Sequence, residues 1–353
     1  MKVAVVRNRS RDGVISRLGR PSPETYGRKS VQRVIDALRA VGHEVACLEG
    51  DKHLLDELER FLEDDLVTGR PSGLVLNMAY GIQGDARYTH VPAMLEMAGV
   101  AYTGAGPLGH AVSLDKAIAK ILMRDAGVPT PRFAVMDAPG EPLGELDFPL
   151  VVKPRHESTS YGVQLVGSRG QLDEAVATIV AEYRQPALIE QYVHGREVCV
   201  GLLGNAPVSV LPAVELHFGA RGNRLVTSDD KYHATADEPE KLCPAPLEPE
   251  LARELDEIAL ATFRACHCRD YARVDIRIDA NGRPFVLEIN SMASLGAGGC
   301  YVRAAAVARY DFAALIDRIV EVAWQRYWPD VSAGTEGFAR RAGSPQRTLA
   351  TPA

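Results

Sequence analysis

Two runs near the C-terminal end decide the fold: Tyr-Ala-Arg-Val-Asp-Ile-Arg-Ile (residues 271–278) and Pro-Phe-Val-Leu-Glu-Ile-Asn (residues 284–290). Both runs alternate apolar and polar residues, which is the period of a β-strand with one polar face. Asn281-Gly282 lies between them, and this pair favours a type I′ turn because both residues accept a positive φ. The sequence therefore predicts a β-hairpin.

The register of this hairpin puts four polar side chains on one face. The expected cross-strand pairs are Arg273 with Asn290, Asp275 with Glu288, and Ile276 with Leu287. Leu287 then lies on the opposite, apolar face. Two carboxylates with an amide oxygen are ligands that Mg²⁺ prefers beside phosphate oxygens, so Asp275, Glu288 and Asn290 are candidate metal ligands. Arg273 is placed where it could stabilise an oxyanion. A solvated surface hairpin is the alternative for this stretch alone.

Length and composition indicate a soluble globular protein of two or three domains. The chain has 353 residues, 46% of them hydrophobic and 24% charged, and a formal net charge of −6. This acidic balance argues against a nucleic-acid partner. No apolar stretch approaches the roughly 20 residues of a membrane span, so we expect no membrane partner. The apolar run at residues 3–6 is expected to be a first strand and not a signal peptide.

The six cysteines are scattered along the chain. Free thiols are typical of cytoplasmic proteins, so we expect a cytoplasmic location. Cys266-His267-Cys268 resembles a metal-binding tract, but no second cluster completes a zinc site. Structural burial is therefore expected for this pair of cysteines.

The N-terminal part alternates strands and helices. Strands are expected at residues 2–6, 45–48 and 74–77, with helices at residues 31–41 and 53–62. This order predicts a parallel sheet with helices on its faces, and ligands bind at the carboxyl ends of such strands. The loops at residues 8–26, which include Glu24, and at residues 78–90 are therefore candidate substrate-binding segments. An acid near a helix N-terminus is the alternative for Glu24.

A candidate phosphate-binding loop follows a strand that ends at Lys153. Small hydroxyl residues such as Thr159 and Ser160, with exposed backbone N–H groups, can surround phosphate oxygens while a lysine supplies the counter-charge. A flexible polar loop is the alternative, and the segment is not a P-loop pattern. The helix at residues 114–126 is expected to begin at Ser113 as N-cap.

Two segments near the C-terminal end have unusual composition. The small residues of 291–300 allow close backbone approach to a ligand. From residue 329 the composition predicts a disordered tail.

Together these segments resemble the ATP-grasp superfamily and, within it, the D-alanine–D-alanine ligase family. The matching segments run in the family's order from about Gly81 to Ile319. They are Val91–Gly106, Leu114–Lys116, Val151–Pro154, Ile189–Glu197, Lys231-Tyr232, Cys243–Ala245, and the two hairpin strands with Ala-Arg-Val-Asp and Leu-Glu-Ile-Asn.

The resemblance implies an α/β (α+β) ATP-grasp fold in which two subdomains enclose ATP. We expect an N-terminal substrate domain at residues 1–109, a central subdomain at 110–190, a C-terminal subdomain at 191–328, and the tail at 329–353. The implied cofactors are ATP and Mg²⁺, with two metal ions expected and Mn²⁺ acceptable. The family commonly dimerises, so a homodimer acting on small-molecule substrates is expected.

The resemblance also assigns roles to individual residues. Those implied to bind ATP are Lys116 and Lys153 at the phosphates, Thr159 and Ser160 in the covering loop, Glu190 and Val193 at the adenine, and Glu197 at the ribose. Asp275, Glu288 and Asn290 are implied to hold Mg²⁺, with Arg273 at the transferred phosphoryl group. Lys231 and Tyr232 are implied to lie on a closing loop.

The departures from the family are on the substrate side. The N-terminal glycine-rich segment is replaced by Arg7–Ser10, and an acidic residue returns only at Glu24. The family's His-Gly loop becomes residues 79–85. After Asn290 the sequence reads Ala293-Ser294, and the later serine-containing pair becomes Gly299-Cys300. The candidate substrate residues are therefore Glu24, Ser294, Gly299, Cys300 and Arg303, the last as a carboxylate clamp with a surface charge as its alternative.

The leading hypothesis is an ATP-dependent carboxylate–amine ligase that works through an acyl phosphate, with a specialised substrate pair. Authentic D-alanyl-D-alanine synthesis is the alternative. Two further hypotheses are a carboxylate kinase and a non-catalytic nucleotide-binding protein, and the intact catalytic set argues against the latter.

Overall fold

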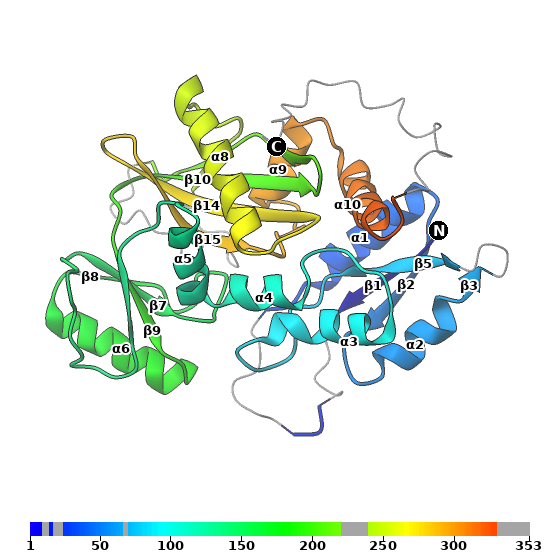
Figure 1. Cartoon of the computed structure of the whole chain (residues 1–353), viewed down its shortest axis with the longest axis horizontal. Helices are drawn as coiled ribbons and strands as arrows, with labels where there is room; N and C mark the ends of the chain where they lie inside the picture. The colour runs from blue at the N-terminus through cyan, green and yellow to red at the C-terminus, as the bar shows by residue number, and fades with distance from the viewer. Residues whose placement is uncertain (9–13, 17–23, 66–69, 220–238, 330–353) are drawn as a thin grey trace.

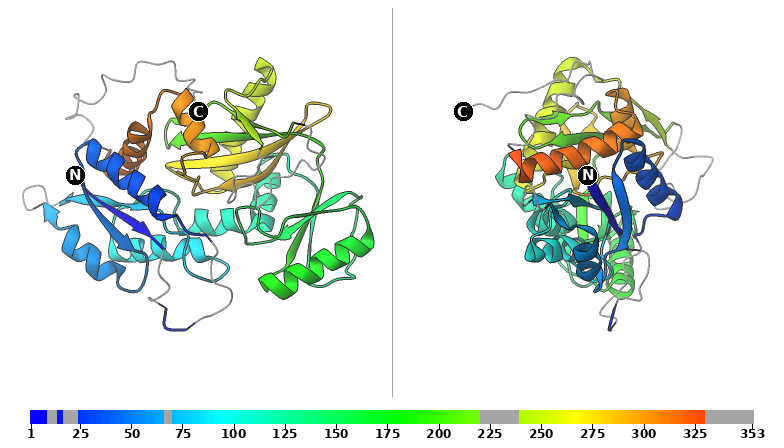
Figure 2. Two further views of the ribbon diagram at one scale, coloured as in Figure 1. Left: turned by 180° about the vertical axis from the view of Figure 1, so that it is seen from behind. Right: turned by 90° about the vertical axis from the view of Figure 1, so that its right-hand side faces the viewer.

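The computed structural model describes residues 1–8, 14–16, 24–65, 70–219 and 239–329. Three sheets organise the chain (Figure 1). The four-stranded sheet and its helix lie at the opposite end of the molecule from the N-terminal sheet, with the largest sheet above and between them (Figure 2). No helix in these residues is both long and apolar enough to cross a bilayer.

The first sheet is parallel, as predicted, with the order β2-β1-β5. Its strands are β1 (Lys2–Arg7), β2 (Glu44–Glu49) and β5 (Gly73–Asn77), and its helices are α1 (Arg28–Ala40), α2 (Leu54–Phe61) and α3 (His90–Ala98). Beside β5, one isolated parallel bridge joins Tyr102 to Val75. A two-stranded ribbon of β3 (Asp64–Asp65) and β4 (Arg70–Pro71) and the short helix η1 (Arg87–Thr89) complete this part.

The core of the first sheet includes a helix from the other end of the chain. Val34 and Leu38 on the apolar face of α1 are fully buried. They share a core with Ile316 and Ile319 of α10 (Phe312–Tyr327), which lies beside α1 (Figure 1). The boundaries expected at residues 109 and 190 stay predictions.

The second sheet is antiparallel, with the order β6-β9-β7-β8. Its strands are β6 (Phe133–Met136), β7 (Leu150–Pro154), β8 (Gln164–Val166) and β9 (Ala187–Gln191), and α6 (Arg169–Tyr183) packs on it. Two helices, α4 (Pro107–Leu114) and α5 (Lys116–Asp125), precede it.

The prediction of Ser113 as the N-cap was wrong, because the cap of α5 is Asp115. The Asp115 carboxylate accepts the backbone N–H groups of Ala117 and Ile118, each at 3.1 Å. Ser113 instead lies inside α4, where its hydroxyl contacts Cys268.

The third sheet has the order β13-β12-β10-β14-β15, with β11 paired to β10. Its strands are β10 (Gly195–Gly204), β11 (Val208–Val210), β12 (Val214–His217), β13 (Glu240–Leu242), β14 (Tyr271–Asp279) and β15 (Pro284–Asn290). The side chains of α8 (Pro249–Ala265) pack on one set of alternating residues of β10, and those of α9 (Cys300–Val307) pack on the other set.

The hairpin register is correct at the site and wrong near the turn. Asp275 faces Glu288 as predicted, and Arg273 faces Asn290, but Ile276 pairs with Val286 and not with Leu287. The turn spans three residues, because Asp279 closes it: its carboxylate accepts the N–H groups of Asn281 (2.8 Å) and Arg283 (2.9 Å). This shifts the register by one residue, and a bulge at Leu287 restores it.

Candidate active site

A cavity of about 540 Å³ lies where the three sheets meet, and it collects most of the predicted site. The predicted residues that line it are Glu24, Lys116, Lys153, Thr159, Ser160, Glu190, Val193, Glu197, Arg273, Asp275, Glu288, Asn290, Ser294, Gly299 and Cys300. Leu287 also lines it, because the bulge turns this side chain away from the apolar face on which we had placed it. Arg303 is exposed on α9 and is not among the lining residues. Lys231, Tyr232 and nearly all of the predicted tail lie outside the described residues.

The polar face of the hairpin is tightly bonded. The Arg273 guanidinium donates two hydrogen bonds to the Asp275 carboxylate, both at 2.7 Å, and the Asn290 amide donates to the same carboxylate at 3.0 Å. Burial lowers the pKa of Arg273, but the Asp275 charge outweighs burial and raises it well above its usual value. Arg273 thus supplies a positive charge directly to the Asp275 carboxylate.

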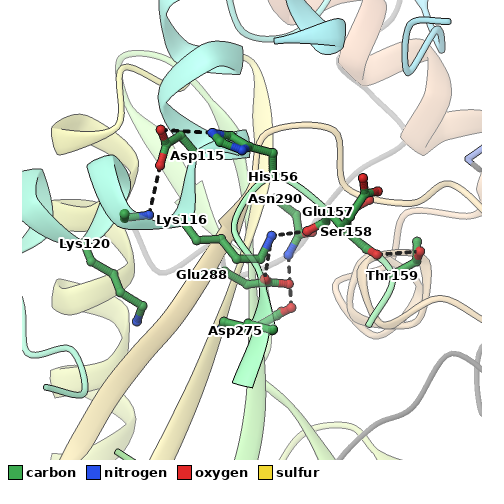
Figure 3. A network of polar contacts seen from close by, with 12 residues as sticks. Asp115, Lys116, Lys120, His156, Glu157, Ser158, Thr159, Asp275, Glu288 and Asn290 are labelled. Carbon is green, nitrogen blue, oxygen red and sulfur yellow. Dashed lines mark hydrogen bonds and ion pairs between the residues drawn. The ribbon is translucent and has the colours of Figure 1, made fainter. Parts of the chain in front are cut away.

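Lysine side chains extend this charge network towards α5. Lys116 donates to the backbone carbonyl of Glu157 and lies 3.7 Å from the Glu288 carboxylate (Figure 3). Asp115, next to it, accepts hydrogen bonds from Arg155 and lies 3.2 Å from His156 (Figure 3). The start of α5 is therefore bonded to both the loop after β7 and the hairpin.

Glu190 of β9 is held by two lysines. Its two carboxylate oxygens lie 2.5 Å from the Nζ atoms of Lys120 and Lys153, respectively. Burial would raise the pKa of Glu190, but Lys120 and Lys153 together lower it, so this carboxylate is ionised. Burial is the main cause that lowers the pKa of Lys120 to about 8. Sequence reasoning missed Lys120, although it follows Lys116 by one helical turn on a buried face of α5.

The candidate phosphate-binding loop has an unusual backbone. Thr159, Ser160 and Gly162 have φ values of 55°, 60° and 69°. Left-handed backbone at two non-glycine residues stores strain, and neighbouring N–H groups in such segments form anion-binding concavities. Gly162 is required, because a Cβ there would lie 2.8 Å from Pro154. The backbone conformation of this loop is compatible with anion binding, and the phosphate-binding role of Thr159 and Ser160 stays a prediction.

Arg277 organises the segment that joins the two antiparallel sheets. It is 1% exposed and donates to the Glu197 carboxylate at 3.1 Å and to the Val193 carbonyl at 2.9 Å. Sequence reasoning missed it because a strand arginine that alternates with apolar residues reads as an exposed surface charge.

The Glu24 end of the cavity contains a buried ion network. The Tyr88 hydroxyl donates to Glu24 at 2.6 Å, and the Arg87 guanidinium lies 3.4 Å from the same oxygen. Arg87 also donates to the Glu157 carboxylate at 3.1 Å and to the His156 carbonyl at 3.0 Å. Burial and the Glu24 charge raise the pKa of Tyr88 well above its usual value, so the phenol stays protonated as a donor. Arg87 and Tyr88 lie in the 78–90 loop that we expected to meet substrate.

Three tyrosines form the wall beside this network. The rings of Tyr26 and Tyr80 are stacked with centroids 5.1 Å apart, and Tyr88 follows at 5.4 Å from Tyr80. The backbone N–H of Leu295 donates to the Tyr26 hydroxyl at 3.2 Å. The small-residue segment after β15 is therefore fixed to the N-terminal wall of the cavity.

Cysteines lie in two different settings. Cys266 and Cys268 are buried in the core beneath α8, which confirms the expectation of structural burial. Within the described residues no group of three or more His, Cys, Asp or Glu side chains is arranged to hold a metal ion. Cys199 and Cys300, by contrast, line the cavity.

Comparison with known proteins agrees with this geometry. The family model described as "D-ala D-ala ligase C-terminus" matches residues 122–321. An uncharacterized protein, y4sG, of Sinorhizobium fredii is 52% identical over 93% of this chain and 98% of its own length. A D-alanine–D-alanine ligase of Syntrophobacter fumaroxidans is 36% identical over 66% of this chain and 75% of its own. The D-alanine–D-alanine ligase of Bacillus anthracis complexed with ATP superposes with a TM-score of 0.71 at 20% identity, covering 92% of this chain and 98% of that one.

A cavity lined by charged side chains where two antiparallel sheets meet, with a parallel-sheet domain beside it, is the arrangement of the ATP-grasp fold. The chain belongs to the D-alanine–D-alanine ligase family.

Proposed function

We propose that this protein is an ATP-dependent ligase that joins an amino acid or small carboxylic acid to an amine through an acyl phosphate, with a specialised substrate pair. The observation that carries the proposal is the convergence of three charge systems on one cavity. These are the lysines at Glu190 and Glu288, the left-handed loop at residues 159–162, and the Arg273–Asp275–Asn290 face.

ATP is proposed to bind between the second and third sheets. Lys116 and Lys153 would contact its phosphates under the loop of Thr159 and Ser160, with the adenine near Glu190 and Val193 and the ribose near Glu197. Support comes from their shared position in the cavity. An ammonium already paired to a carboxylate can exchange that partner for a phosphate at little net cost in desolvation.

The candidate metal ligands have the chemistry and the placement that Mg²⁺ binding would need. Asp275 and Glu288 are directly opposed on neighbouring strands, and the Asn290 amide is within hydrogen-bond distance of Asp275. These hard oxygen donors would hold Mg²⁺, or Mn²⁺ in its place, at one or two positions. Bound there, the ion would neutralise charge on the phosphate oxygens. Arg273 would give up its two bonds to Asp275 and turn towards the reacting oxygens.

The reaction proceeds in two steps. The substrate carboxylate attacks the γ-phosphorus of ATP, so that an acyl phosphate forms and ADP leaves. The amine then attacks the acyl carbon, the C–O bond to phosphate breaks, and phosphate leaves. Cations such as Arg273 and Lys116 would stabilise negative charge in both steps. An acyl phosphate formed in the 540 Å³ cavity would have to be kept from water, because hydrolysis competes with attack by the amine.

The Glu24 network supports a substrate pair other than D-alanine with D-alanine. Glu24 is 3% exposed, and one of its oxygens already accepts Tyr88 and lies near Arg87. Part of its charge is therefore compensated within the protein, which weakens its attraction for a substrate ammonium. D-Alanyl-D-alanine synthesis is the second candidate, favoured by the names of the relatives with 36% and 31% identity.

A phosphate-release screen tests the proposal. The protein is mixed with ATP, Mg²⁺ and pairs of acids and amines, and the products are identified by mass. We expect release with an acid–amine pair other than two D-alanines, and none with Arg273→Ala. Rapid D-alanyl-D-alanine formation at ordinary substrate concentrations would rule out a specialised substrate pair. If Arg273→Ala leaves ATP turnover unchanged, the proposed ligase reaction at this site is ruled out.

Hydroxylamine trapping separates a ligase from a carboxylate kinase. A kinase would release acyl phosphate that hydroxylamine captures without any bound amine. Homodimerisation and a cytoplasmic location stay predictions.

A further inference from the structure

Arg277 of β14 and Glu197 of β10 form a buried ion pair in the wall of the cavity. The two residues lie directly opposite each other on neighbouring strands, and the Arg277 Nε atom donates to the Glu197 carboxylate at 3.1 Å. They are only 1% and 8% exposed, and both line the cavity. The strand pairing therefore holds the Glu197 carboxylate against a partner that is itself enclosed by the protein.

The same guanidinium also holds the backbone that joins the two antiparallel sheets. Its Nη1 atom donates to the Val193 carbonyl at 2.9 Å, and Val193 lies between the end of β9 at Gln191 and the start of β10 at Gly195. A guanidinium is planar and its donors have a fixed geometry, whereas a lysine ammonium is a point charge on a flexible stem. One arginine thus sets the position of a carboxylate and of a peptide group relative to each other.

Aromatic rings enclose this guanidinium. Its central carbon lies 5.1 Å from the centroid of the Tyr192 ring and 6.0 Å from that of the Phe218 ring. Cations within about 6 Å of an aromatic centroid are attracted to the ring. The orientation of Arg277 is therefore set by these rings as well as by its hydrogen bonds to Glu197 and Val193.

We propose that Arg277 is a positioning residue for nucleotide selection, which acts through Glu197 and Val193. This role rests on the proposed function, in which the ribose of ATP lies near Glu197 and the adenine near Val193. Arg277 holds the Glu197 carboxylate ready to accept hydrogen bonds from the ribose hydroxyls, and it fixes the Val193 peptide beside the base. The ligand class that this arrangement selects is a ribonucleotide, in preference to a nucleotide whose sugar lacks hydroxyls.

A carboxylate fixed in this way distinguishes sugars by their hydroxyl groups. A carboxylate offers about four acceptor sites, so the bond from Arg277 does not by itself prevent acceptance from a sugar. Hydrogen bonds to charged groups are stronger than those between neutral groups. A nucleotide without ribose hydroxyls should therefore bind about 10-fold or more weakly than ATP. Without Arg277 the carboxylate is no longer held at the sugar, and this preference should disappear.

Nucleotide selectivity separates this role from a purely structural one. A variant that only loosens the fold weakens the binding of every nucleotide by the same factor. The ratio of the Kd of dideoxy-ATP, which lacks both ribose hydroxyls, to the Kd of ATP then keeps its wild-type value. Loss of positioning instead weakens ATP more than dideoxy-ATP, because only ATP uses the Glu197 contact, and the ratio falls.

Calorimetric titration of the full chain with ATP and with dideoxy-ATP, each with Mg²⁺, measures this ratio. We expect about 10 or more in the wild type and about one in Arg277→Met and in Glu197→Gln. The double variant should bind ATP no more weakly than either single variant, because both residues act on the same contact. Arg283→Met is the matched control and should keep the wild-type ratio. Arg283 belongs to the same hairpin and is ion-paired, but its side chain is 69% exposed and does not line the cavity.

If Arg277→Met does not fold, because it leaves a buried carboxylate without its partner, Arg277→Lys carries the test. It keeps the charge but not the planar fork, and it should lower the ratio by about threefold or more. A wild-type ratio near one overturns the role of Arg277, as does a wild-type ratio that persists in a folded Arg277 variant or one that falls equally in Arg283→Met. In each of these cases ATP still binds and the proposed function stands. A wild type that binds neither nucleotide overturns the proposed function and the role of Arg277 with it.

Discussion

Replacement of Lys120 by methionine removes one of the two cations that hold Glu190. At 2.5 Å and an effective dielectric constant of about 20, one such pair has a Coulomb energy of about 7 kcal/mol. The desolvation of Lys120, which is 0% exposed, offsets much of this energy. Breaking a buried pair costs about 3–5 kcal/mol, and we expect about 3 kcal/mol for Lys120→Met because Lys153 still contacts Glu190.

Lys120→Met should also weaken ATP binding, although Lys120 is not one of the lysines proposed to contact the phosphates. In the wild type, Lys120 keeps Glu190 neutralised when Lys153 turns to a phosphate. Without Lys120, the Lys153 ammonium can leave only by exposing an uncompensated buried carboxylate. Part of the 3 kcal/mol then opposes nucleotide binding, and a share of about 1.4–2.8 kcal/mol raises the Kd for ATP by about 10- to 100-fold.

Calorimetric titration with Mg²⁺ and a non-hydrolysable ATP analogue measures this effect. Arg124→Met is the matched control, since Arg124 is an exposed cation on the same helix, and it should bind as the wild type does. Urea unfolding gives the stability term separately. A Kd for Lys120→Met within twofold of the wild-type value, in a folded protein, would refute the reasoning.

Three further changes test other parts of the structure. Gly162→Ala, at φ 69° and with a Cβ only 2.8 Å from a proline side chain, should cost about 1–3 kcal/mol and weaken nucleotide binding. Gly170→Ala, whose added Cβ would lie in open space, should neither destabilise the protein nor weaken nucleotide binding. Equal effects of the two changes in calorimetry would contradict this expectation. Arg326→Met leaves the fully buried Asp270 carboxylate without its 2.9 Å partner and should lower the free energy of unfolding in urea by about 3–5 kcal/mol. An unchanged midpoint would show that this pair contributes nothing. Burial lowers the pKa of His110 to about 3 from 6.5, so the unfolded state binds the extra proton between those values. The free energy of unfolding should therefore fall by up to about 1.4 kcal/mol per pH unit as pH drops through that window. The slope should flatten in His110→Gln. If the slope persists in that variant, His110 is not its cause.

The hairpin shows why the alternation of apolar and polar residues predicted the facing site residues correctly. Alternation and burial fix which face each strand presents, so Asp275 had to face Glu288 once the polar residues shared a face. The details of the turn were not predictable in the same way. The Asp279 carboxylate closes a longer turn, and the bulge at Leu287 compensates for the resulting register shift. Either feature alone would have moved the two carboxylates out of register.

The residues that were missed are held by partners far away in the chain. Arg87 bridges Glu24 and Glu157, and Arg277 bridges Glu197 and the Val193 carbonyl. Composition and spacing describe neighbours along one element, whereas these pairs exist only after separate elements have packed. The candidate ATP and metal residues could be named from the sequence because the family's motifs carry them over. The candidate substrate residues could not be named in the same way, because the sequence departs from the family there.

The packing of α10 on α1 has a consequence for biosynthesis. Residues 312–327 supply part of the core under the first sheet, so α1 cannot complete the burial of its apolar face until these residues have left the ribosome. Domains generally fold as units during synthesis, and the second sheet has a core of its own within residues 134–189. The order of folding is therefore expected to run against the order of translation, with the first-made sheet among the last parts to become stable.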